Sequence, residues 1–326
     1  MRAARRTLAA VLVAGSLTLS GCGIEERIVH LQPAPTENSQ AGAPLRVEAA
    51  EQIAARVLAQ AAAATTEEER AAVTVGPALR VANARAARTA PTAPTADVVT
   101  PQAPTVLAMS RGTAWPRAIL AATLDEATQT QYLHVLVSGG PTEQFVLYAT
   151  ASMLPGATVP GLGELGEGTS FAASSGEEPI EGSVVVEEYA NGLAFPDPAE
   201  TSVVTVDDTY AESLRSNAAK QAEAFGDLAT LSVTHAALPD SLVAFGTADG
   251  GRLIFAQMTR TSAITLGEDA KELKIEDEAL QTVSGTSVVT ESFTVEHLEN
   301  VVFVAPAEGL AGLIGAEEVL LRAEGS

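Results

Sequence analysis

Apolar residues just after position 45 recur three or four positions apart, which places them on one face of a helix. They are Ala50, Ile53, Ala54, Val57, Leu58 and Ala61. Further on, Thr66 followed by Glu69 has the spacing of a capping box and predicts a second, short helix. Gly76-Pro77 should end that helix, and residues 78–88 should form a third one.

The pattern then changes from helical to strand-like. Three short apolar segments, 118–124, 132–137 and 144–151, are separated by turn residues, and this order predicts an antiparallel meander. The Pro/Thr-rich stretch 91–104 comes before them and is expected to be a surface loop. Residues 155–182 are rich in glycine and show no clear period, so we interpret them as a connection.

The second half of the chain repeats this order. Residues 184–193 predict a short helix, and Thr209 with Glu212 predicts a capping box at the start of a longer one. Strands are expected at 229–236, 242–247, 252–262, 287–294 and 301–304. Asp249-Gly250 predicts a hairpin turn, because both residue types accept positive φ.

Helices followed by an antiparallel sheet, twice over, indicate the α+β class. We therefore expect two small modules, each with helices followed by a curved antiparallel sheet, at 46–160 and 183–326. Residues 161–182 would form the linker between them.

The first residues have the pattern of a signal peptide, predicted for 1–21. Three arginines precede an apolar run, 8–19, which is too short to span a bilayer as a mature helix. Residues 22–45 are polar and contain several prolines, and we interpret them as a flexible tether.

The segment Leu19-Ser20-Gly21-Cys22 resembles the lipobox of bacterial lipoproteins. The resemblance implies a diacylglycerol on the sulfur of Cys22 and cleavage just before that residue. Two acyl chains suffice for stable anchoring, so the expected location is the extracytoplasmic face of the bacterial cell membrane. An ordinary secretory signal with a coincidental cysteine is the alternative.

The charge balance narrows the possible partners. The chain has 19 Lys and Arg against 41 Asp and Glu, a formal net charge of −22. This acidity argues against nucleic-acid binding, which depends on neutralising phosphates, and against a basic patch on an anionic membrane. No calcium-loop motif occurs, and we expect neither a metal nor another cofactor.

No catalytic constellation stands out. His134, His235 and His297 lie in or beside different predicted strands, without the spacing of metal ligands. The spacing Gly161-x-Gly163-x-x-Gly166 matches a dinucleotide fingerprint, but no strand–turn–helix unit surrounds it. We therefore predict no catalytic residue.

Two features are weak candidates for partner contact. Trp115 is the lone tryptophan, and it is expected to be a buried anchor at a strand start or an exposed partner-binding residue. Glu268, Asp269 and Glu272 belong to an acidic series that predicts a solvated loop or exposed ribbon. Contact with a cation or a basic partner is the alternative for that series.

Three segments, 113–117, 153–160 and 247–251, are similar to segments of uncharacterised actinobacterial lipoproteins. The expected modules are also similar to the nuclear transport factor 2-like and cystatin-like folds. That superfamily includes enzymes, ligand binders and interaction modules, so the resemblance leaves the function open. The Asp and His residues that the enzymes of that superfamily use inside the cone cannot be aligned here.

The leading functional hypothesis is a non-enzymatic, lipid-anchored envelope protein that binds a protein partner or another envelope component. The first alternative is a carrier of a small apolar ligand or lipid, held in a cavity of one module. The second alternative is an enzyme of unrecognised type.

Overall fold

The computed structural model describes residues 42–88, 103–174 and 182–326. This part of the chain holds six α-helices and twelve strands, and its sheets are antiparallel, which confirms the predicted α+β class. The segments Leu19 to Cys22, 22–41 and most of the predicted 91–104 loop lie outside the described residues. No helix within the described ranges is long and apolar enough to cross a membrane.

The first sheet is the predicted meander with one additional strand. Its order is β1-β2-β3-β4, with β1 (Thr105–Met109), β2 (Arg117–Asp125), β3 (Thr130–Ser138) and β4 (Val146–Ser152). The sequence did not predict β1, because a five-residue apolar run without alternation carries no strand period.

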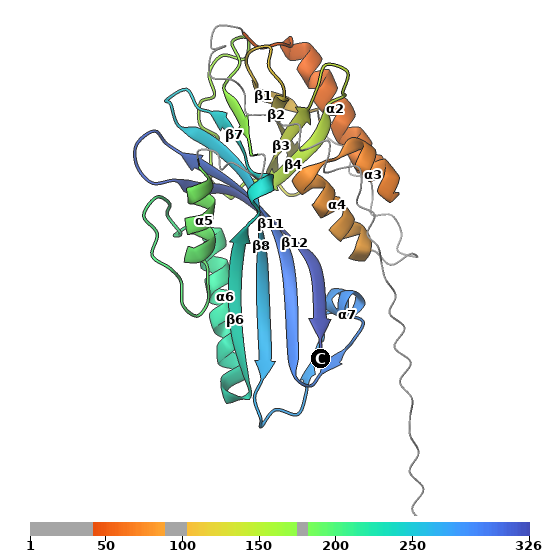
Figure 1. Cartoon of the computed structure of the whole chain (residues 1–326), viewed down its shortest axis with the longest axis vertical. Coiled ribbons are helices and arrows are strands. Elements are labelled where there is room, and N and C mark those ends of the chain that lie inside the picture. Colours follow the sequence, from red (N-terminus) through yellow and green to blue (C-terminus); the bar gives the residue numbers. More distant parts are fainter. Residues whose placement is uncertain (1–41, 89–102, 175–181) are drawn as a thin grey trace, which may run out of the picture.

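Helices cover the outer face of this sheet, as Figure 1 shows near the top of the molecule. They are α2 (Val47–Ala63), α3 (Glu67–Val73) and α4 (Gly76–Arg88). The capping box is confirmed, since the Thr66 side chain accepts from the Glu69 amide and the Glu69 carboxylate from the Thr66 amide. Gly76 opens α4 at φ +56°, and a Cβ there would lie 2.8 Å from the Tyr148 ring.

The second sheet has six strands in the order β12-β11-β8-β7-β5, and β6 also pairs with β8. The strands are β5 (Phe171–Ala173), β6 (Ala229–Ala237), β7 (Val243–Gly246), β8 (Arg252–Leu266), β11 (Ser292–Ala305) and β12 (Gly312–Gly325). One edge of β8 pairs first with β7 and then with β6, while β11 follows its other edge throughout. Asp249-Gly250 lies in the turn between β7 and β8, as predicted.

Two predictions for the end of the chain were wrong. The segments 287–294 and 301–304 are not separate strands, because β11 runs unbroken from Ser292 to Ala305, preceded by the short β10 (Val288–Val289). The intervening polar residues hid this continuity, since Glu299 and Asn300 are buried only through tertiary partners. The strand β12 was not predicted.

The two sheets pack face to face and share one core. Leu120 and Val135 of the first sheet belong to the same buried cluster as Phe245, Phe255 and Val302 of the second. Both faces of β2 and β3 are therefore covered, which explains their continuous burial rather than alternation.

This shared core means that the two-module layout is not confirmed. The predicted linker 161–182 includes β5, which pairs with β7, and Leu162, which belongs to the shared core. A glycine-rich stretch can thus add a strand to a sheet whose other members come from much later in the chain.

Two helices cover the other face of the second sheet, α5 (Ser183–Gly192) and α6 (Thr209–Phe225). The predicted capping box at Thr209 is wrong by one residue, because Asp208 is the N-cap and its side chain accepts from the Ala211 amide. A carboxylate at this position satisfies a free N–H and favours the helix dipole.

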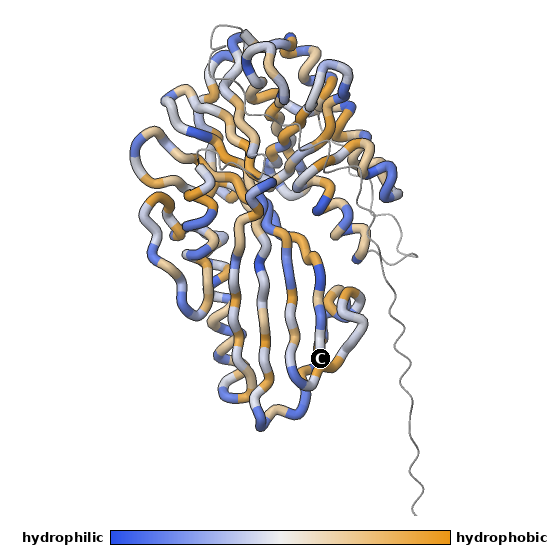
Figure 2. The backbone as a smooth tube through the Cα atoms, viewed as in Figure 1, coloured by the Kyte–Doolittle hydropathy of each residue, from blue (hydrophilic) through white to orange (hydrophobic). Residues whose placement is uncertain are grey.

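The lower half of the second sheet is covered on one face only. Along β6, Leu231, Val233 and His235 are buried, while Ser232 and Thr234 between them are exposed. In Figure 2 apolar residues are dense where the sheets and helices meet, and the lower strands carry more polar residues. The short elements β9 (Leu273–Lys274) and α7 (Glu278–Ser284) lie in and after the acidic series.

Candidate functional site

A pocket of about 390 Å³ lies between α2 and α4, above the strands of the first sheet. We call it the helix pocket. The two helices and the linker before α4 supply one side of it: Leu58, Ala61, Ala62, Thr74, Ala78, Val81, Ala82 and Arg85. The strands supply the other side: Thr123, His134, Leu147, Thr150, Asn300 and Glu317.

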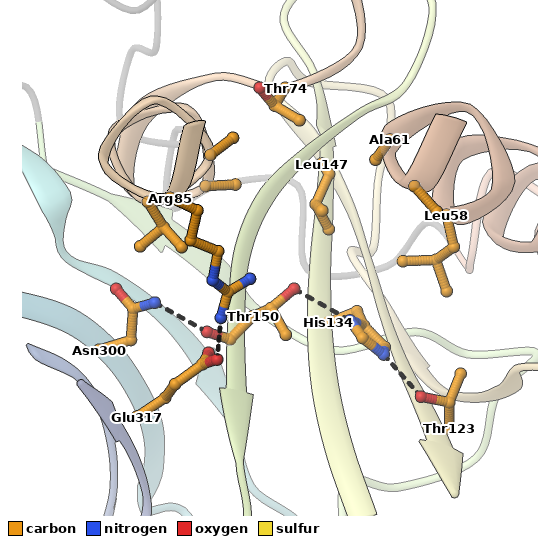
Figure 3. A pocket seen from close by; sticks show the side chains of 14 residues that line it. Leu58, Ala61, Thr74, Arg85, Thr123, His134, Leu147, Thr150, Asn300 and Glu317 are labelled. Carbon is orange, nitrogen blue, oxygen red and sulfur yellow. Dashed lines mark hydrogen bonds and ion pairs between the residues drawn. The ribbon is translucent and has the colours of Figure 1, made fainter. Parts of the chain in front are cut away.

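The helical side of this pocket is mainly apolar. Figure 3 shows Leu58 and Ala61 on α2 at one side of the space and Arg85 on α4 at the other. Small alanine side chains at the facing positions leave the two helices separated above the sheet. Such an apolar wall with a few polar groups is the usual composition of a small-molecule site.

The strand side holds a hydrogen-bonded row around His134. Its Nε2 lies 2.8 Å from the Thr123 hydroxyl, and its Nδ1 lies 3.0 Å from the Thr150 hydroxyl. Burial lowers the pKa of His134 to about 4, so the imidazole is neutral at physiological pH. Each ring nitrogen thus shares one hydrogen bond with a threonine, and the side chain is held in place.

The polar row continues below the pocket. Asn300 donates to the Thr150 carbonyl at 3.0 Å, and Gln257 donates to the Asn300 side chain at 2.7 Å. Arg80 on α4 donates to Gln257 at 2.6 Å. This interlayer network ties α4 to both sheets. At the pocket edge, Arg85 forms an ion pair with Glu317 (Figure 3).

A second pocket, of about 220 Å³, lies between α6 and the second sheet. We call it the α6 pocket. Its lining includes His235, Arg260, Tyr210 and Glu318. His235 and Tyr210 contact one buried carboxylate, and Arg260 pairs with Glu318. That carboxylate is Glu299, whose side chain is 0% exposed.

Three groups surround the Glu299 carboxylate. The Nδ1 of His235 lies 2.8 Å from one oxygen, the Tyr210 hydroxyl donates to the other at 2.7 Å, and Arg260 lies 3.7 Å away. Burial alone would raise the pKa of Glu299, but the His235 hydrogen bond and the nearby positive charges outweigh it, so the pKa lies below its ordinary value. The carboxylate is therefore ionised at neutral pH.

The same charge acts on Tyr210. Burial, together with the neighbouring Glu299 charge, raises the pKa of its hydroxyl far above the ordinary value. The hydroxyl therefore keeps its proton and serves as a donor. Arg260, which lies near Glu299, also forms an ion pair with Glu318 at 2.8 Å.

The structure places the three histidines of the described residues in two separate groups. His134 lies in the helix pocket, whereas His235 and His297 are register partners of Arg260 on either side, on β6 and β11. Within the three described ranges, no group of three or more His, Cys, Asp or Glu could hold a metal ion. No sequence pattern predicted that these residues lie side by side, because they belong to three separate strands whose register is set by tertiary structure.

The predicted partner-contact residues do not form one site. Trp115 is half-buried before β2, with the Arg117 guanidinium 4.3 Å from its ring centre. Glu268, Asp269 and Glu272 are exposed after β8, in the other sheet. Sequence reasoning missed Gln257 and Glu299. Gln257 stands out only as a polar residue in the apolar first half of β8, and Glu299 lies among other polar residues of β11.

No protein-family model matches the chain, and comparisons with curated proteins and with solved structures give no match either.

Proposed function

We propose that this chain is a lipid-anchored, extracytoplasmic carrier that binds a small, mainly apolar ligand in the helix pocket. One observation supports the proposal: a cavity of about 390 Å³ with apolar helical walls and a fixed polar floor. Small-molecule sites usually measure about 300–1,000 Å³ and combine these two kinds of surface.

The geometry favours a ligand with one polar end. The methyl and isobutyl groups of Ala61, Ala62 and Leu58 would contact its apolar body. The ion pair of Arg85 with Glu317 lies at the edge, where a polar end can keep contact with water. The volume suits a small molecule or one end of a longer lipid.

The ligand test uses native mass spectrometry of the full chain purified from its own host in detergent. We expect a co-purifying mass with the wild type and with Ala59→Trp, and its loss with Ala62→Trp. Both alanines are exposed on α2, but only Ala62 lines the pocket, so Ala59→Trp is the matched control. The same yield of bound mass in both variants would contradict the proposal.

The anchor is tested separately. Cys22 is the only cysteine in the chain, so Cys22→Ala removes the only thiol that can carry the lipid. We expect the variant to leave the membrane fraction or to stall in processing, with no incorporation of labelled fatty acid. Continued labelling of this variant would overturn the anchoring assignment.

The hypothesis of a protein partner stays a prediction. Its candidate residues, Trp115 before β2 and the acidic group 268–272 after β8, adjoin strands of different sheets and define no common surface. We therefore give the carrier function precedence.

A further inference from the structure

The α6 pocket has two buried nitrogens that the described part of the chain leaves without a hydrogen-bond partner. They are Nε2 of His235 and Nε of Arg260. The two residues are direct register partners on β6 and β8, and both line the pocket. The His235 side chain is 0% exposed and that of Arg260 is 11% exposed, so bulk water does not satisfy them.

These two nitrogens limit which groups a ligand can present to them. Nδ1 of His235 faces the ionised Glu299, so Nδ1–H donates to that carboxylate and Nε2 is left to meet another group. Nε of Arg260 can only donate, because a guanidinium has no acceptor. A pair of neighbouring hydroxyls can satisfy both nitrogens, because each hydroxyl can donate and accept.

The charges around the pocket balance. Arg215 and Arg260 carry positive charge, and Glu299 and Glu318 carry negative charge. The Arg215 guanidinium already donates to the Val206 and Gly192 carbonyls. This balance gives no net attraction for either an anion or a cation and favours a neutral ligand.

The rest of the lining fits the same kind of molecule. Ser213, Asn217 and Gln221 are exposed on one side of α6 and offer hydroxyl and amide groups at the rim. Phe195 and Leu214 supply apolar surface beside them. Polyhydroxylated molecules present both polar edges and C–H faces, so they use both kinds of wall.

We propose that the α6 pocket is a second ligand site, separate from the helix pocket, which binds a neutral polyhydroxylated molecule the size of a monosaccharide. Arg260 and His235 recognise adjacent hydroxyls, and Ser213, Asn217 and Gln221 contact the remaining ones. Its volume of about 220 Å³ corresponds to roughly seven water molecules, at about 30 Å³ each.

The test measures binding of defined probes to the full chain, in a detergent without a sugar headgroup. D-Glucose, N-acetyl-D-glucosamine and myo-inositol serve as neutral probes, and glutamate and inorganic phosphate serve as charged ones. Saturation-transfer NMR detects contact, and calorimetric titration gives the dissociation constant. We expect saturable binding of at least one neutral probe and none of the charged probes.

Three variants test the location. Ser213→Phe should fill the pocket and weaken binding by about tenfold or more, equivalent to one decade in the dissociation constant. Ala219→Phe adds the same ring on the exposed side of α6, outside the pocket, and should leave binding unchanged. Arg260→Lys keeps the charge beside Glu318 but removes the Nε donor, and should also weaken binding.

Thermal melts of each variant establish that it is folded before binding is compared. The proposal is overturned if no neutral probe binds, if only charged probes bind, or if Ser213→Phe and Ala219→Phe bind equally well. The Ala62→Trp variant blocks only the helix pocket, so it should retain binding of the neutral probe.

Discussion

The two faces of β8 and β11 bury polar groups of different kinds. On the face toward the first sheet, Gln257 and Asn300 are register partners in an amide network that ends at the neutral His134 row. On the face toward α6, the neighbouring residue Glu299 is a buried carboxylate held by His235, Tyr210 and Arg260. Because side chains alternate along a strand, two consecutive residues serve two different sites.

This comparison separates two responses to pH. His134 has a folded-state pKa of about 4 against an ordinary 6.5, so on acidification the unfolded chain takes up this proton before the folded protein does. The free energy of unfolding therefore falls as the pH drops from 6.5 to about 4. Glu299 has a lowered pKa, so its contribution is present above the ordinary value of 4.5 and is lost as the pH falls through the folded-state pKa. The amide face thus loses stability in mild acid, and the charged face does so only in stronger acid.

Removing the buried carboxylate should have the largest effect. Glu299→Ala leaves His235, Tyr210 and Arg260 without their common partner, and breaking a buried ionic pair costs about 3–5 kcal/mol of unfolding free energy. Urea denaturation followed by circular dichroism measures this change. Glu299→Gln keeps the shape and one acceptor, so it should lose less. A loss below about 1 kcal/mol in Glu299→Ala would show that the cluster adds little to stability.

The next effect is the acid response of His134. A shift from 6.5 to about 4 corresponds to a loss of about 3 kcal/mol in unfolding free energy across that pH range, at about 1.4 kcal/mol per pKa unit. Carboxylates elsewhere titrate in part of the same range, so the quantity to compare is the pH profile of the wild type against that of His134→Gln. We expect a flatter profile for the variant. Parallel profiles would rule out His134 as the source.

A single substitution on the amide face should lower the free energy of unfolding by less than one on the charged face. Gln257→Leu removes the partners of Arg80 and Asn300 and leaves buried donors and acceptors unpaired, at about 1–3 kcal/mol of unfolding free energy. A double-mutant cycle with Asn300→Leu measures the coupling of the two amides. Additive losses in this cycle would mean that the amides do not act as a unit.

The smallest expected loss comes from the cap of α3, and it serves as a reference for additivity with the variants of both faces. Thr66→Ala removes the side-chain acceptor of the capping box, at about 1 kcal/mol of unfolding free energy. Thr66 contacts neither network, so its loss should add independently to that of Glu299→Ala and of Gln257→Leu. Strong coupling to either would show that the cap of α3 is part of that network.

The local elements could be predicted because their signals act over a few residues. The helix at 47–63, the capping box at Thr66 and the turn at Asp249-Gly250 each follow from side chains within one or two turns of backbone. The cap of α6 was placed one residue late, because Asp208 and Thr209 are both suitable caps and only the backbone geometry distinguishes them.

By itself the sequence determined the α+β class, most helices and strands, and the positively charged and apolar start that predicts a lipid anchor. Only the tertiary structure decided that the sheets share one core, that the predicted linker contributes β5, and that Glu299 and Asn300 face different pockets. The physical reason is distance along the chain: Tyr210 and Glu299 are 89 residues apart, and Pro77 and Gln257 are 180 apart. Periodicity and turn chemistry set local conformation, whereas long-range packing decides which buried polar groups find partners.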